Sequence, residues 1–132
     1  MNQLKAKFLI DTVILIDHLN GIASATNWLK NNSDGESVVS VITRAEVLSG
    51  ANEEEMADII LFLDNYHCIA FDKGIADKAD ELRRKYNWRL PDAFQAALAI
   101  QHKLLLVTRN TKDFNEKKHA FVKIPYRFKS LK

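Results

Sequence analysis

The chain has 132 residues, of which 47% are hydrophobic and 27% are charged, a composition typical of a globular domain rather than a disordered chain. This length predicts a single domain over residues 1–132, built around one sizeable core. Nineteen basic and seventeen acidic residues leave a formal net charge of +2, which is too small to indicate nucleic-acid binding by charge alone.

The cysteine content and the N-terminal segment restrict the class of protein further. Cys68 is the single cysteine, which excludes an intrachain disulfide and a cysteine-based zinc site. Residues 1–21 include an apolar stretch, but Asp11 and Asp17 interrupt it before it reaches the length of a signal-peptide core or a membrane span. We therefore expect a cytoplasmic protein without a membrane partner.

In chain order, short apolar runs alternate with helical patterns. Continuous rather than alternating apolar runs are typical of parallel strands that are covered on both faces. The predicted strands are FLI at 8–10, SVVSV at 37–41, CIAF at 68–71, LLLV at 104–107 and, at the sheet edge, FVKI at 121–124.

Helical patterns occupy the intervals between these runs. Ser24 is the predicted N-cap of the first helix, Thr43 opens the second, Glu53 opens the third with two further glutamates, and Pro91 fits the first turn of the last. The predicted helices span 24–32, 43–49, 53–67, 73–86 and 90–100. Strands that alternate with helices predict an α/β sandwich with a central, mainly parallel sheet.

Acidic residues stand at the carboxyl ends of two predicted strands and at the starts of two predicted helices, near the edge where open sheets of this kind bind ligands. Asp11 directly follows the first strand, and Glu46 lies in the first turns after the second. Asp92 opens the helix that leads into LLLV, and Asn110 and Asp113 follow that strand. We expect these side chains to converge at one edge of the sheet.

Each acid also has a local structural interpretation that the sequence leaves open. Asp11 suits the N-cap of a helix that starts near residue 12, and Asp92 suits the positive end of a helix dipole. Thr43 and Glu46 match the spacing of a capping box, and Asp113 suits an Asx turn. Four acids at the same end of one sheet are harder to explain by capping alone.

The residue types favour a hard metal ion. Carboxylate oxygens suit Mg²⁺ or Mn²⁺, and such ions assist attack by water on a phosphodiester bond. Asp17 is expected to lie outside the group, because six helical residues, roughly 240° of rotation, separate it from Asp11. Zinc is disfavoured because no metal-ligand spacing occurs among the histidines, which are His18, His67, His102 and His119.

Four segments together resemble the successive motifs of the PIN-domain family, and in particular its single-domain VapC-type toxin ribonucleases. The order, spacing and total length fit over nearly the whole chain for FLIDTVILID (8–17), TRAEVLSG (43–50), LPDAFQAALAI (90–100) and LLLVTRNTKDF (104–114). One departure is Val13, where relatives often carry a polar residue. The resemblance implies a PIN-like three-layer α/β sandwich, in which helices flank the sheet.

The resemblance also implies an activity and a site. It implies an endoribonuclease that depends on Mg²⁺, for which Mn²⁺ substitutes, with the catalytic, metal-binding acids Asp11, Glu46, Asp92 and Asp113. A supporting polar shell is implied for Thr12, Thr108 and Asn110. The implied partners are an RNA substrate, a small antitoxin protein that blocks the active site, and a second copy of the chain in a homodimer.

Two other functions are alternatives to this one. A non-catalytic, PIN-like RNA-binding scaffold would keep the fold without turnover, although the presence of all four acids argues against it. A phosphate-accepting receiver domain requires paired acids after its first strand and a phosphoacceptor Asp after its central one, and neither arrangement occurs. The basic runs at 83–89 and 117–132 are typical of solvated faces, or of surfaces that steer RNA.

Overall fold

The predicted apolar runs form the centre of the fold in the computed structural model, which describes residues 6–33 and 35–128. The sheet has five strands in the order β3-β2-β1-β4-β5, and all four pairings are parallel. The strands are β1 (Phe8–Ile10), β2 (Ser37–Ser40), β3 (His67–Ile69), β4 (Leu105–Val107) and β5 (Val122–Lys123). The predicted parallel sheet is confirmed.

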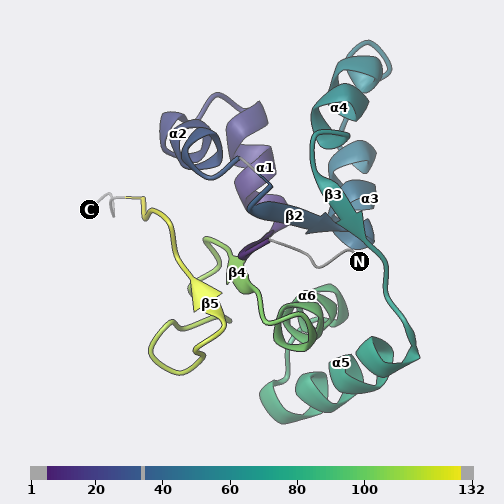
Figure 1. The fold of residues 1–132 in the computed structure, drawn as a ribbon, viewed down its shortest axis with the longest axis vertical. Helices are drawn as coiled ribbons and strands as arrows, with labels where there is room; N and C mark the ends of the chain where they lie inside the picture. Colours follow the sequence, from purple (N-terminus) through teal and green to yellow (C-terminus); the bar gives the residue numbers. More distant parts are fainter. Residues whose placement is uncertain (1–5, 34, 129–132) are drawn as a thin grey trace.

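Helices cover both faces of this sheet, which makes the three predicted layers (Figure 1). The helices α1 to α4 pack on one face, and α5 and α6 pack on the other. Their bounds are α1 (Thr12–Leu19), α2 (Ala23–Asn31), α3 (Val41–Ser49), α4 (Met56–Leu63), α5 (Lys73–Tyr86) and α6 (Leu90–Gln101). Within the described residues, no helix is long and apolar enough to cross a membrane.

Burial on both faces explains why the strands are continuously apolar. Leu9 and Leu106 face the core beneath α5 and α6, whereas their neighbours Ile10 and Val107 face the core beneath α1 to α4. All four side chains are completely buried, as the alternation of a strand between two covered faces requires. A polar residue at any of these positions would lie in a core, so only the strand ends are free to carry chemistry.

Two helix starts differ from the sequence prediction. The helix α2 begins at Ala23, and Ile22 rather than Ser24 stands at its N-cap without a side-chain bond. The helix α3 begins at Val41, where the Ser40 hydroxyl accepts a bond of 3.1 Å from the backbone N–H of Thr43. The capping box at Thr43 is therefore wrong.

The predicted start of the helix at 53–67 is wrong, whereas the predicted start of the helix at 73–86 is confirmed. The helix α4 begins at Met56, because the glutamates at 53–55 form the turn before it. The helix α5 spans the predicted residues 73–86, and Asp72 caps it by accepting a bond of 2.8 Å from the backbone N–H of Ile75. Asp72 is thus a structural acid, and it does not line the cleft described below.

The strand order places a crevice beside β1. From β1 the chain passes through α1 and α2 to β2 on one side, and it later returns through α5 and α6 to β4 on the other side. The two crossovers diverge at this point, so the carboxyl ends of β1 and β4 border the place where open α/β sheets bind ligands. Asp11 and Thr108 follow these two ends directly.

Candidate active site

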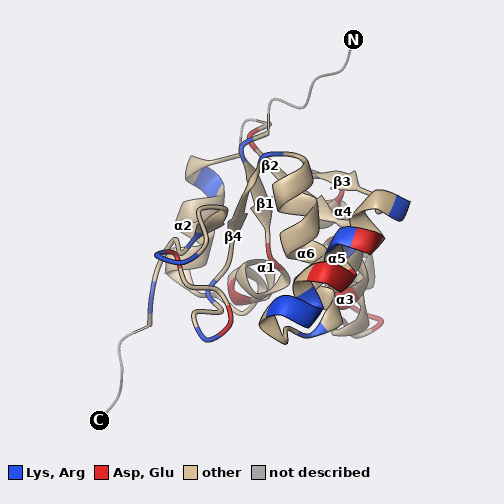
Figure 2. Ribbon diagram, turned by 90° about the horizontal axis from the view of Figure 1, so that it is seen from below, with Lys and Arg blue, Asp and Glu red and all other residues tan. Residues whose placement is uncertain are grey.

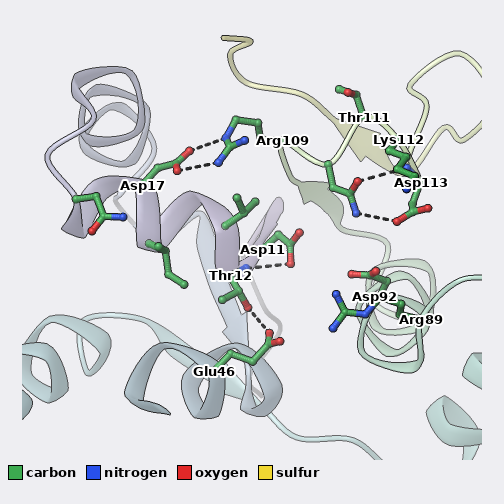
Figure 3. Close-up of a pocket in the computed structure, with 14 residues that line it drawn as sticks. Asp11, Thr12, Asp17, Glu46, Arg89, Asp92, Arg109, Thr111, Lys112 and Asp113 are labelled. Atoms are coloured by element: carbon green, nitrogen blue, oxygen red, sulfur yellow. Dashed lines mark hydrogen bonds and ion pairs between the residues drawn. The ribbon is translucent and has the colours of Figure 1, made fainter. Parts of the chain in front are cut away.

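A cleft of about 660 Å³ opens beyond the carboxyl ends of β1 and β4 (Figure 3). The predicted acids come from β1, α3, α6 and the loop after β4, and all four line this cleft. They are Asp11, Glu46, Asp92 and Asp113. Thr12 and Asn110 also line it, whereas Thr108 is buried behind Asp11. The structure therefore brings the seven residues of the predicted site together.

Asp11 is the most firmly held of the four acids. Its carboxylate accepts bonds from the Thr12 backbone N–H at 2.9 Å, the Thr108 hydroxyl at 2.7 Å and the Gln95 amide at 3.2 Å. Burial raises the pKa of Asp11 despite these three bonds, which favour the charged form. Asp11 is the N-cap of α1, as its local structural interpretation predicts, and it also lines the cleft.

Asp92 occupies the first turn of α6 and is only half-buried. Among the described residues, no hydrogen-bond donor contacts its carboxylate (Figure 3). Burial and the negative charges of Asp11, Asp113 and Glu46 raise the pKa of Asp92 to about 6, although Arg89 opposes this. The charge of Arg89 thus acts on this carboxylate from nearby, but the described residues form no ion pair or hydrogen bond with it.

The other two acids are oriented by neutral side chains. The Thr12 hydroxyl donates to Glu46 over 2.6 Å, and the Asn110 amide donates to Asp113 over 3.1 Å. The backbone N–H of Asp113 donates in return to the side-chain oxygen of Asn110 at 3.3 Å, so Asn110 rather than Asp113 bonds the backbone of this loop. The Trp88 indole anchors this loop by donating to the Asp113 backbone carbonyl at 3.1 Å.

Several cleft residues were missed by the sequence prediction. Arg89 and Lys112 place positive charge on the walls beside Asp92 and Asp113 (Figure 3). Gln95, which is buried behind the cleft and contacts Asp11, was missed as well. A buried polar side chain among the alanines of α6 is the signal that marks it.

Asp17 lines the same cleft, contrary to the expectation that it lies apart from Asp11. Its carboxylate is already engaged, because Arg109 donates to its two oxygens over 2.7 and 2.9 Å and the Tyr126 hydroxyl donates over 2.7 Å. The Arg109 guanidinium also lies 4.3 Å from the centre of the Phe128 ring. This cluster therefore ties α1 to the loop after β4 and to the C-terminal segment.

We expect Asp17→Asn to lower the free energy of unfolding at neutral pH by about 1.5–3 kcal/mol, the range for hydrogen bonds to charged groups. Burial raises the pKa of Asp17, but the bonds from Arg109 and Tyr126 outweigh it, and the net shift is downward from 3.8. A depressed pKa contributes stability that is complete above pH 3.8 and is lost as the pH falls through the depressed value.

Urea denaturation of both proteins from about pH 7 to about pH 3 measures this dependence. The difference in the free energy of unfolding between the wild type and Asp17→Asn should stay constant down to about pH 5 and shrink below about pH 4. Asp80→Asn is the matched control, because Asp80 pairs with Arg84 on the exposed surface of α5 and should change stability little. A difference that does not narrow at low pH would contradict the assignment.

The four cleft acids offer only oxygen ligands, which match Mg²⁺ or Mn²⁺ better than zinc. Within residues 6–33 and 35–128, no three His, Cys, Asp or Glu side chains already lie close enough together to hold a metal ion. The unpaired charge of Asp92 beside three other acids nevertheless fits a cation at this place. The donor chemistry fits such an ion, and the arrangement is open rather than preassembled.

Comparison with known proteins identifies the family. The PIN domain model matches residues 8–120. Ribonuclease VapC10 from Mycobacterium tuberculosis is 30% identical over 112 residues, which cover 80% of this chain and 84% of the relative. A toxin–antitoxin complex from Klebsiella pneumoniae contains a chain with 34% identity and a TM-score of 0.84, which covers 92% of this chain and 100% of that chain.

A more distant structure supports the fold alone. FitAcB from Neisseria gonorrhoeae is 24% identical, with a TM-score of 0.74 over 89% of this chain and 97% of that chain. These likenesses confirm the resemblance to VapC-type proteins that the four sequence motifs indicated. With the family model matching residues 8–120 and the three-layer fold in place, the chain belongs to the PIN domain family.

Proposed function

We propose that this chain is a metal-dependent endoribonuclease that acts as the toxin of a toxin–antitoxin pair. The observation that carries the proposal is the convergence of four carboxylates, from four separate segments, on one cleft at the carboxyl edge of the sheet. The names of two relatives support it, because one is a ribonuclease and the other is part of a toxin–antitoxin complex.

Asp11 and Asp92 are the proposed main metal ligands, and Glu46 and Asp113 bind directly or through water. Mg²⁺ is the proposed ion, with Mn²⁺ able to replace it. When bound, such an ion lowers the pKa of a water molecule and shields the charge of the phosphate. Since the acids are not preassembled, we expect the half-buried Asp92, whose carboxylate no described donor holds, to rotate when an ion binds.

The neutral polar residues of the site have positioning roles in this proposal. Thr12 orients Glu46, Asn110 orients Asp113, and Thr108 holds Asp11 while it accepts the backbone N–H of Asn110 over 3.1 Å. These bonds keep the carboxylate oxygens directed within the cleft rather than toward bulk solvent. The chain would therefore spend little binding energy on ordering its ligands.

RNA is the proposed substrate, and a single strand is the form whose backbone bends into a narrow acidic cleft. Arg89 and Lys112 line the cleft and provide positive charge for phosphates next to the cleaved bond. The last turn of α5 adds a basic surface outside the cleft, formed by Arg83, Arg84 and Lys85 (Figure 2). These charges offset the repulsion between the acidic cleft and the RNA backbone.

The partners follow from the same proposal. A small antitoxin protein would bind the chain and block the cleft. Two copies of the chain would form a homodimer, and the proposed location of this assembly is the cytoplasm. The likeness to a chain in a toxin–antitoxin complex supports the antitoxin. One domain over residues 1–132 also stays a prediction.

Incubation of the purified protein with a mixed RNA pool tests the proposal. We expect cleavage with Mg²⁺ or Mn²⁺, no cleavage with EDTA, and recovery when excess Mg²⁺ is added back, because the acids need a cation between them. Sequencing of the fragment ends then reveals the cleavage site.

Two outcomes would count against the proposal. Cleavage that persists in EDTA would exclude a metal-dependent site. Intact RNA throughout, from folded protein freed of bound inhibitor, would favour the non-catalytic RNA-binding scaffold. Calorimetry with Mn²⁺ separates the two functions, since a scaffold does not need to bind the ion.

A further inference from the structure

Gln95 is a polar side chain at a position that the fold would fill with an apolar one. It lies in the middle of α6 and is 2% exposed. Its neighbours on this helix include Ala93, Ala96, Ala97 and Ala99, all completely buried. A long amide in such surroundings loses hydrogen bonds to water, so its protein contacts must explain its position.

The amide nitrogen of Gln95 reaches two different segments of the site. It donates to Asp11 over 3.2 Å and to the Thr43 hydroxyl over 2.8 Å. An amide NH₂ group carries two hydrogens, so both bonds form at once. The contacts span 84 and 52 residues of sequence, and they join α6 to the end of β1 and to α3.

The contact with Thr43 continues to a second acid. The hydroxyls of Thr43 and Thr12 lie 3.1 Å apart, and Thr12 lies 2.6 Å from Glu46. An ionised carboxylate accepts only, so the single Thr12 proton goes to Glu46 and the Thr43 hydroxyl donates to Thr12. A continuous chain of donors therefore runs from Gln95 through the two threonines to Glu46.

The amide oxygen of Gln95 indicates that stability alone does not account for this residue. Among the described residues, Oε1 of Gln95 is buried and has no hydrogen-bond partner. A buried acceptor without a partner carries a desolvation cost, which an apolar side chain of similar size would remove. The amide nitrogen of Gln95 therefore bonds to the site, whereas its amide oxygen has no partner among the described residues.

We propose that Gln95 is a positioning residue that holds Asp11 directly and Glu46 through Thr43 and Thr12, so that one side chain sets the orientation of two proposed metal ligands. This inference rests on the proposed metal-dependent activity for its functional consequence. Outer-shell groups of this kind fix the orientation of metal ligands.

Gln95→Leu is the decisive variant, and Gln101→Leu on the same helix is its matched control. Gln101 is exposed and contacts Asp72 rather than the cleft. In Gln95→Leu we expect Mg²⁺ affinity by calorimetry and the kcat of RNA cleavage to fall by about 10- to 100-fold. The KM for RNA should stay unchanged because Gln95 is buried.

A double-mutant cycle tests the chain of donors itself. Thr43→Val removes one hydroxyl at nearly constant volume, and it interrupts the same path to Glu46 as Gln95→Leu does. If the path is shared, the double variant should lose much less kcat than the product of the two single losses. If the loss of kcat in the double variant equals the product of the two single losses, the two residues do not act through one shared path.

Carboxyl ¹³C resonances of the metal-free protein give a readout that needs neither RNA nor a metal ion. Gln95→Leu should shift the resonances of Asp11 and Glu46 and leave that of Asp113 unchanged, because Asn110 holds Asp113 independently. An unchanged Glu46 resonance would overturn the inference, even if the wild type proves inactive and the proposed function fails. A loss of Tm with unchanged kcat and Mg²⁺ affinity would likewise overturn it, since that result marks a purely structural residue.

Discussion

Asp92→Asn should abolish RNA cleavage and at the same time make the metal-free protein more stable. Asn keeps the shape of the side chain but replaces the charged oxygens that are proposed to bind the cation. The loss should exceed about 100-fold, which is the upper end of what the removal of an outer-shell partner costs. The fold should tolerate the change, because no donor among the described residues contacts the Asp92 carboxylate.

The gain in stability follows from the pKa of Asp92, which is raised from 3.8 to about 6 chiefly by burial and then by Asp11. A raised pKa means that the charged form costs more free energy in the folded chain than in the unfolded one. This cost is absent below pH 3.8 and complete above about pH 6. Asp92→Asn should therefore raise the free energy of unfolding at pH 8 by about 1–2 kcal/mol, after allowance for solvent screening.

Denaturation in EDTA at about pH 8 and about pH 4 measures the gain, which should shrink at the lower pH. Saturating Mg²⁺ should stabilise the wild type and not the variant, because a ligand stabilises only the state that binds it. Asp77→Asn, on the exposed surface of α5, is the control for the same chemical change. Normal turnover by folded Asp92→Asn would refute the role of Asp92.

The strands and α5 were predictable from the sequence because their signals are local and strong. Leu9, Ile10, Leu106 and Val107 are apolar at consecutive positions, as burial on both faces demands, and this pattern identifies a parallel strand without any knowledge of its neighbours. The helix α5 carries buried apolar residues on one stripe and a capping acid at its start. The helical spacing of these apolar residues and the capping acid together therefore predict its bounds.

Helix starts were less predictable because capping depends on backbone conformation as well as residue type. Ser40 and Thr43 are both good capping residues, and the sequence alone does not decide between them. Ser40 caps α3 because the chain leaves β2 directly into the helix and keeps this residue extended. Thr43 is thereby placed inside the first turn, where its hydroxyl is free to accept from Gln95.

The acids of the site were predictable from the rule that parallel strands end at one edge, which brings Asp11 and Asp113 together. Their supporting contacts were not predictable in this way. The bond between Gln95 and Asp11 spans 84 residues, and the pair of Arg109 and Asp17 spans 92. Such contacts depend on how α6 and the loop after β4 pack against α1, which local patterns do not encode.

Asp11→Ala and Asp11→Asn should both abolish cleavage, yet they should have opposite consequences for the fold. Ala removes the N-cap of α1 and leaves the Thr108 hydroxyl and the Gln95 amide without their shared acceptor. We expect a loss of about 2–4 kcal/mol in the free energy of unfolding, from the lost cap together with the unpaired buried donors. Asn keeps the cap and reduces the second cost, because its oxygen still accepts from Thr12 and Gln95 and its amide donates to the Thr108 oxygen, which leaves only the Thr108 proton without its acceptor.

Urea denaturation and RNA cleavage of the two variants, side by side, separate the structural role of Asp11 from its proposed chemical one. Burial raises the pKa of Asp11, so removal of the charge in Asp11→Asn should leave stability at neutral pH unchanged or higher. Inactivity in Asp11→Asn then reports the loss of the charged ligand rather than the loss of the fold. Cleavage by folded Asp11→Asn at the wild-type rate would show that Asp11 serves the structure alone, and the proposed metal site would then need another principal ligand.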